Sequence, residues 1–323
     1  MFIWKKLGRV YNPLDYPNRP DWMFEYALAP STLVVGKSLR VYFGCRPPRD
    51  PDGQVLTYTG FIDLNIRNLF EVQAISSEPV MELGSTGTFD EFGTYPFSCL
   101  RRESDILAYF AGWTRTESVP FNVSIGSAVS TDGGATFARL GRGPAIPFTH
   151  DEPFVISGPK LRKFGKEYYL FYIAGREWIV VGGRKEISHR IRMATSVDGI
   201  NWNKQNRDLI PTFWADSESQ ASPDVFFAGG IYHMFFCGWV PESFRESKSR
   251  KIGYAWSHDL VNWTRDDSKA GIDVSPDGWD SEMVAYPHVF ELEGQIYMLY
   301  IGNEVGRYGF GLATLESFRD EPL

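Results

Sequence analysis

The sequence predicts an all-β fold, a five-bladed β-propeller with four-stranded blades, and three observations carry that prediction. A proline followed by an apolar stretch, a turn and an aromatic run recurs at intervals of 66, 63, 64 and 64 residues; the five prolines are Pro30, Pro96, Pro159, Pro223 and Pro287. Each unit reads as a hairpin of two short strands, then a third strand and an Asp-containing turn. The fifth unit ends one strand early. Repetition at such a period indicates a closed ring of blades.

The hairpin strands are rich in Val, Ile, Phe and Tyr, and they turn at Gly36, Glu103, Gly165, Gly229 and Gly294. Third strands follow in SIGSAVSTDGG, RIRMATSVDG, KIGYAWSHDL and GFGLATLES. The turns after them lie at Asp132, Asp198 and Asp259, and lead to fourth strands that begin near Phe137, Trp202 and Trp263. One of these turns, STDGGATF, is similar to the Asp-box of sialidases, but its place between third and fourth strands predicts a turn without a catalytic role.

The missing strand is expected at the other end of the chain. The fifth unit stops at its third strand, residues 308–315, whereas WKKLGRVYNP at residues 4–13 resembles the fourth-strand segment at 137–147. The sequence therefore predicts that the N-terminal strand closes the ring, and that residues 1–323 form one domain.

Composition excludes several classes of partner. A formal net charge of −7 speaks against nucleic acid, which demands a basic surface. No apolar run has the length of a signal peptide's core or of a membrane span. Cys45, Cys99 and Cys237 show no ligand-like spacing. We therefore expect a cytoplasmic protein without a membrane partner, cofactor or metal, whose cysteines pack in the core.

Carboxylates recur ahead of the repeat prolines and are the candidate catalytic residues. Five residues before the proline lie Glu25, Glu91, Glu218 and Glu282, while the third unit has Phe154 there and carries Glu152 slightly earlier. Further acids flank them at Asp90, Asp151, Asp216 and Asp280. Because first strands line a propeller channel, these acids are expected at one mouth, where crowding and burial would separate their pKa values into those of an acid and a base. The alternative is that they cap strand ends or face solvent.

The second strands are expected to end at the same mouth and to supply substrate-binding residues. The candidates are Arg46, Trp113, Arg176, Trp239, Glu304 and, beside the fifth proline, His288. Aromatic faces and arginine forks suit a sugar ring, although the tryptophans could equally plug the core. Two following loops are basic and contain Arg184, Lys185, His189, Arg190, Arg192, Arg245, Lys248, Arg250 and Lys251. These could hold phosphate or carboxylate, or be solvated charge.

The chain resembles the five-bladed propeller glycosidases, a grouping that includes glycoside hydrolase families 32, 43, 68, 117 and 130. The resemblance rests on the five units, on ATSVDGINW at 194–202, on AWSHDLVNW at 255–263 and on the acids before first strands. By blade position, the likeness to family 43 implies a base at Glu25, a modulating acid at Glu91 with Asp90, and a general acid at Glu152 with Asp151. The Asn-Asp-Pro and Arg-Asp-Pro motifs of families 32 and 68 are absent from the expected blades.

Three functions follow from this resemblance and stay open at this point. The first is a glycoside hydrolase that cleaves a small glycoside or oligosaccharide with carboxylates in the channel. The second is a phosphate-dependent glycoside phosphorylase, for which the basic loops would hold phosphate. The third is a carbohydrate-binding propeller without catalysis. All three imply a small carbohydrate partner, and the arginines favour an anionic one.

Overall fold

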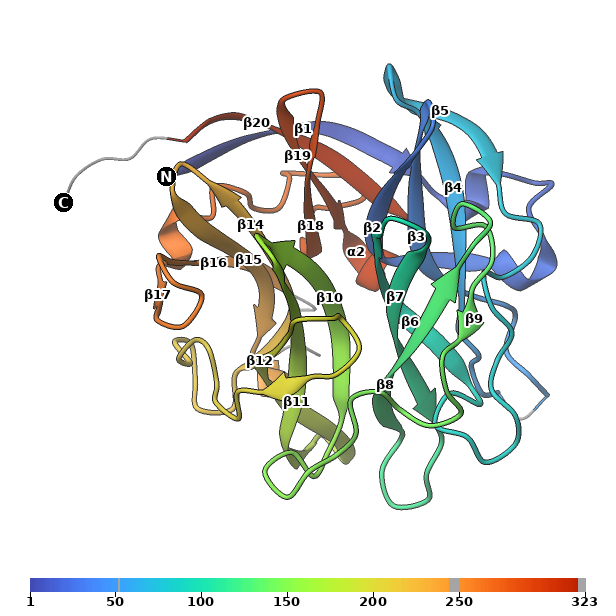
Figure 1. Cartoon of the computed structure of the whole chain (residues 1–323), viewed down its shortest axis with the longest axis vertical. Helices are drawn as coiled ribbons and strands as arrows, with labels where there is room; N and C mark the ends of the chain where they lie inside the picture. Colours follow the sequence, from blue (N-terminus) through green and yellow to red (C-terminus); the bar gives the residue numbers. More distant parts are fainter. Residues whose placement is uncertain (52, 244–249, 319–323) are drawn as a thin grey trace.

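The chain forms a ring of five antiparallel sheets of four strands each, as predicted (Figure 1). This computed structural model describes residues 1–51, 53–243 and 250–318. In each of the first four blades, consecutive strands lie side by side from the channel outwards. The described helical segments are short: η1 (Pro13–Asp15), η2 (Asp21–Met23), η3 (Asp267–Lys269) and α2 (Asn303–Gly306). No described helix is long and apolar enough to cross a bilayer.

The strands follow the repeat units of the sequence. Blade I holds β2 (Glu25–Val35), β3 (Ser38–Arg46), β4 (Tyr58–Asn65) and β5 (Asn68–Ile75). Blade II holds β6 (Gly93–Arg101), β7 (Ile106–Thr114), β8 (Asn122–Ser130) and β9 (Ala138–Arg139). Blade III holds β10 (Ile156–Phe164), β11 (Glu167–Val181), β12 (Arg184–Ser196) and β13 (Asn203–Lys204). Blade IV holds β14 (Ser219–Ala228), β15 (Ile231–Trp239), β16 (Lys251–Ser257) and β17 (Trp263–Arg265).

Blade V joins the two ends of the chain and confirms the predicted ring closure. It holds β18 (Ala285–Leu292), β19 (Gln295–Ile301), β20 (Phe310–Phe318) and, as its outer strand, β1 (Phe2–Tyr11). Figure 1 shows β1 running beside β20, and the pairing extends from Phe2 opposite Phe318 to Tyr11 opposite Phe310. The hydrogen bonds of this ladder hold the ring shut.

Each repeat proline marks a β-bulge in the innermost strand. Proline has no N–H to give to the ladder, so pairing slips at this point. The register shifts in all five first strands, between residues 28 and 31, 94 and 97, 157 and 160, 221 and 224, and 285 and 288. The bulges turn the residues before the prolines out of the ladder, towards the channel mouth.

The Asp-containing turns join neighbouring blades. Tyr42 Oη on β3 donates a hydrogen bond of 2.7 Å to the carbonyl of Gly134 in the next blade, and Tyr109 Oη on β7 donates one of 2.6 Å to Gly199. Gly134 has φ +88°, and a Cβ there would lie 2.3 Å from Tyr42 Oη. Glycine is therefore required at this contact, which explains the turn by packing.

The three cysteines are buried, as expected, and unpaired with one another. Burial raises the pKa of Cys45 and Cys237, and that of Cys99 to about 12. A thiol in that state is protonated and inert near neutral pH. The cysteines are core side chains.

Candidate functional site

A cavity of about 490 Å³ lies at one mouth of the channel, within the size range of small-molecule sites. It is bounded by the ends of second strands and by the first-strand bulges. Three predicted binding residues, Arg46, Trp113 and Trp239, line it from blades I, II and IV. The aromatic side chains of its wall are Tyr95, Trp113, Phe121, Trp178, Trp239 and Tyr286. Such faces can pack against the apolar side of a sugar ring.

The bulged first strands form the cavity floor. Tyr95, Gly158, Ser222 and Tyr286 each directly precede a repeat proline, and all four line the cavity. Ser222 and Tyr286 have φ of 52° and 51°, a region that residues other than glycine rarely occupy. Backbone strain of this kind concentrates at functional sites, where the surrounding fold enforces it. Here it aims side chains into the cavity.

Beneath the floor, a buried charged cluster fills the axis of the ring. We call Lys160, Asp224 and His288 the axial cluster; their side chains are at most 4% exposed. His288 Nε2 accepts a 3.0 Å hydrogen bond from the backbone N–H of Thr32, so its proton lies on Nδ1, which donates to Asp224 Oδ2 at 2.7 Å. Lys160 Nζ lies 3.2 Å from the same oxygen. First strands of blades I, III, IV and V thus meet across the axis.

The protonation states of the axial cluster follow from these contacts. Burial lowers the pKa of His288 to about 4, and the Lys160 ammonium acts in the same direction. Burial acts to raise the pKa of Asp224, but Arg162, Lys160 and His288 outweigh it and hold this pKa well below the usual range. Burial lowers the pKa of Lys160, and the Asp224 carboxylate opposes this shift. The cluster therefore places the Asp224 carboxylate between Lys160 and an imidazole that is neutral at pH 7.

Three arginines at the cavity are each stacked on an aromatic ring. The guanidinium carbon of Arg46 lies 4.6 Å from the ring centre of Tyr26, that of Arg115 lies 4.1 Å from Phe92, and that of Arg250 lies 4.1 Å from Trp239. Stacking fixes the plane of a guanidinium and leaves its edge for hydrogen bonds.

Two of these arginines keep hydrogen-bonding capacity. The Nε atoms of Arg46 and Arg115 are buried and make no hydrogen bond within the described part of the chain. Arg115 is held in place by Asp50 at 3.0 Å. A buried donor without a partner is costly.

The hairpin of blade III forms one side of the cavity. Strands β11 and β12 extend past the rest of their sheet, and bring Trp178, Lys185 and Glu186 to the cavity wall. The hairpin rests on blade II, where Trp178 meets the Phe121 ring edge-on at 5.5 Å and Lys185 donates to the carbonyl of Ser118. Arg245 and Lys248, named with these basic residues, lie outside the described residues.

The cavity is cationic, although the chain as a whole is acidic. Burial, with Arg250 and Arg190 nearby, lowers the pKa of His189 to about 3, so this cavity residue is neutral. Its charged residues are then Arg46, Arg115, Lys185, Glu186 and Arg250. Among the described residues, no group of three or more His, Cys, Asp and Glu could hold a metal ion. The arrangement suits an anion.

The predicted ring of acids does not line this cavity. Four blades instead pair the acid before the first strand with a cation on their own outermost strand. The pairs are Asp90 with Arg139, Glu152 with Lys204, Glu218 with Arg265, and Asp280 with Lys6. Because fourth strands lie at the rim of the ring, these pairs draw the acids away from the axis. None of these predicted acids lines the cavity, and their catalytic role stays a prediction.

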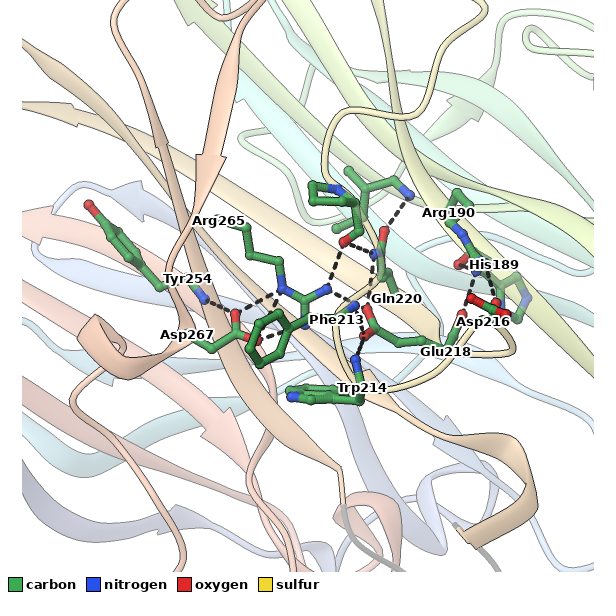
Figure 2. Close-up of polar contacts among 12 residues, drawn as sticks. His189, Arg190, Phe213, Trp214, Asp216, Glu218, Gln220, Tyr254, Arg265 and Asp267 are labelled. Atoms are coloured by element: carbon green, nitrogen blue, oxygen red, sulfur yellow. Dashed lines mark hydrogen bonds and ion pairs between the residues drawn. The ribbon is translucent and has the colours of Figure 1, made fainter.

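Glu152 and Glu218 are buried and ionised. Burial acts to raise the pKa of Glu218, but Arg265 and the backbone N–H groups of Trp214 and Phe213 bring this pKa below its ordinary value (Figure 2). Burial also acts to raise the pKa of Glu152, but Lys204, Tyr172 and Arg192 bring this pKa below its ordinary value. A general acid needs a raised pKa. These contacts indicate a structural role for Glu152 and Glu218.

The other candidates do not line the cavity. Glu25 is bound by Arg307 at 3.0 Å, Glu91 accepts from the backbone N–H of Gly87, and the Glu282 side chain is exposed. Asp151, Asp216 and Arg176 are exposed, and Glu304 lies in α2. His288 belongs to the axial cluster, below the floor. The catalytic roles of Glu25, Glu91, Glu152, Glu218 and Glu282 all stay predictions.

The sequence interpretation missed part of the cavity wall. Arg115, Tyr95 and Tyr286 were not among the candidate residues, and Lys185, His189 and Arg250 were noted only as basic loop residues. A signal was present for the tyrosines: both directly precede a repeat proline. The bulge places that position, and not the fifth residue before the proline, at the channel.

We expect Glu218→Gln to lower the free energy of unfolding by about 2 kcal/mol, because it removes charged hydrogen bonds from a buried site. Urea denaturation measures this loss. A catalytic carboxylate would behave in the opposite way, with unfolding unchanged and turnover abolished. That outcome would contradict the structural part given to Glu218 here.

Two of the buried histidines, His189 and His288, are neutral and predict acid sensitivity above the range in which carboxylates titrate. Their native pKa values are lowered, to about 4 for His288 and about 3 for His189, so the unfolded chain binds two more protons below about pH 6.5. Stability is then lost as pH falls: we expect about 2.5 kcal/mol less unfolding free energy at about pH 5.5 than at pH 7. Urea titrations at both pH values test this, with the exposed His150→Gln as a control that keeps the slope. A flat profile would contradict it.

Comparisons with known proteins place the chain in a family. No protein-family model matches it. It is 36% identical over 315 residues to the uncharacterized proteins MT1551 and Rv1502 from two strains of Mycobacterium tuberculosis, covering 97% of this chain and 99% of each relative. Among solved structures, it is similar to a glycoside hydrolase with a TM-score of 0.74 and 17% identity, over 98% of this chain and 93% of the other.

Two further solved structures carry family designations. A thermostable family-43 glycoside hydrolase matches with a TM-score of 0.64 and 12% identity, over 95% and 97% of the two chains. A Bombyx mori GH32 beta-fructofuranosidase matches with a TM-score of 0.60 and 15% identity, over 89% of this chain and 61% of the other. At these identities the likeness shows the fold. The chain thus belongs to one family with the mycobacterial proteins MT1551 and Rv1502, and its fold is the five-bladed propeller found in glycoside hydrolase families 43 and 32.

Proposed function

We propose that this protein recognises an anionic carbohydrate in the cavity at the channel mouth. The observation that carries the proposal is the combination of three stacked arginines with a wall of aromatic rings in one cavity. Aromatic faces take the C–H side of a sugar ring, and guanidinium edges take a carboxylate or phosphate group. The fold, which hydrolases of sugars share, supports a carbohydrate over other small anions.

Calorimetric titration tests the proposal with four probes: D-glucose, D-glucuronate, glucose 6-phosphate and inorganic phosphate. We expect at least one acidic sugar to bind about tenfold or more tightly than glucose, since one charged hydrogen bond contributes about 1.5–3 kcal/mol. Equal affinity for glucose, or binding of none of the sugars, would overturn the proposal. Phosphate that binds alone and increases the affinity for glucose would instead favour phosphorolysis.

Hydrolysis is the second candidate, and it is favoured by the presence of the Glu186 carboxylate in the cavity wall. Glu186 is the carboxylate among the described residues that line the cavity. Glycoside hydrolysis ordinarily uses two carboxylates, one as acid and one as base or nucleophile. Release of nitrophenol from p-nitrophenyl glucuronide that disappears in Glu186→Gln, with binding of D-glucuronate retained, would establish it. Turnover unaffected by this substitution would remove Glu186 from the reaction.

A further inference from the structure

The floor of the cavity closes the channel. Gly158, Ser222 and Tyr286 line the cavity, and two residues further along the same strands lie the members of the axial cluster, Lys160, Asp224 and His288. This cluster spans the axis through direct contacts of 2.7–3.2 Å and is buried. A ligand in the cavity therefore cannot pass through the ring.

The cavity is also closed on one side, where blades II and III meet. The blade III hairpin brings Trp178 and Ile187 to the wall, and Trp178 packs on Phe121 of blade II. Lys185 closes the same gap through its bond to the carbonyl of Ser118. Blades II and III are thus bridged above their sheets, so a long chain cannot leave the cavity between these two blades.

From this enclosure we infer that the cavity receives the terminal residue of an acidic glycan, and not a segment in the middle of a chain. A mid-chain segment needs a groove open at two ends, whereas a terminal residue needs one way in. The inference rests on the proposed function and adds the position at which the glycan is recognised. The arginines then hold the acidic group of that last residue, while the rest of the glycan extends into solvent.

Oligogalacturonates of increasing length test this, because every residue in them carries a carboxylate. Terminal recognition predicts one protein per chain end and an affinity that stays level once the chain exceeds a disaccharide, by calorimetric titration of the intact protein. Mid-chain recognition predicts several proteins on one long chain and an affinity that rises with length. The second result would overturn the inference and leave the proposed function standing.

A matched control uses long oligogalacturonates modified at both ends, with an unsaturated ring at one end and a reduced, opened ring at the other. Terminal recognition predicts loss of binding to these chains, although their interior is unchanged. Retained binding would contradict it. If glucose 6-phosphate binds but no oligogalacturonate does, the inference alone fails. If D-glucuronate, glucose 6-phosphate and every oligogalacturonate fail to bind, the proposed function fails, and this inference fails with it.

Discussion

Asp224→Asn is expected to lower the free energy of unfolding by about 4 kcal/mol, because it leaves Lys160 and Arg162 without their shared buried counter-charge. The Asp224 side chain has no exposure to solvent, so water cannot replace the lost interaction. In a chain of this length, the melting temperature should fall by roughly 6 °C. Urea and thermal denaturation measure both quantities.

Two companion variants make this result specific. Asp277→Asn changes an exposed acid and should shift the unfolding free energy by no more than about 0.5 kcal/mol. Adding Lys160→Met to Asp224→Asn removes the uncompensated ammonium and should restore part of the lost stability. A loss below about 1 kcal/mol in Asp224→Asn would show that the axial cluster does not tie the blades together.

The second large effect is expected on binding. Replacing Arg46 and Arg115 together by Met should weaken the binding of an acidic sugar by roughly a hundredfold to a thousandfold, from the loss of two charged hydrogen-bonding groups. Methionine keeps the unbranched stem that packs beside Tyr26 and Phe92. Calorimetric titration with D-glucuronate and glucose 6-phosphate measures the change.

Controls separate lost charge from lost folding. Arg115 also holds Asp50, so Arg46→Met alone serves as a second variant, with an expected loss of roughly tenfold to a hundredfold. Arg67→Met removes an exposed arginine from the turn between β4 and β5 and should leave affinity unchanged. Unchanged affinity in the double variant, with its thermal unfolding intact, would place the anion outside this cavity.

The fold was predictable because its determinants are local and repeated. Hairpin turns, aromatic strands and a proline at a near-constant interval specify each blade, and the likeness of residues 4–13 to a fourth strand specified the closure. The positions of Arg46, Trp113 and Trp239 followed in the same way, since second strands end at the same mouth. Register and topology carried these predictions.

The placement of the acids could not be predicted in that way. A carboxylate before a first strand can turn inwards or outwards, and the choice depends on its cation. The four cations lie on fourth strands: Arg139, Lys204, Arg265 and Lys6. Lys6 also lies at the opposite end of the chain from its acid. Pairing over such sequence separations is set by tertiary packing. The bulge that exposes Tyr95 and Tyr286 shows the same limit, because it shifts the channel-facing position along the strand.

A crystal structure of the protein soaked with D-glucuronate tests the central claim most directly. We expect the sugar in the cavity, with its carboxylate within hydrogen-bond distance of Arg46 or Arg115 and its ring against Trp113 or Trp239. A sugar bound instead between Glu25 and Glu91, or on another face of the ring, would contradict it.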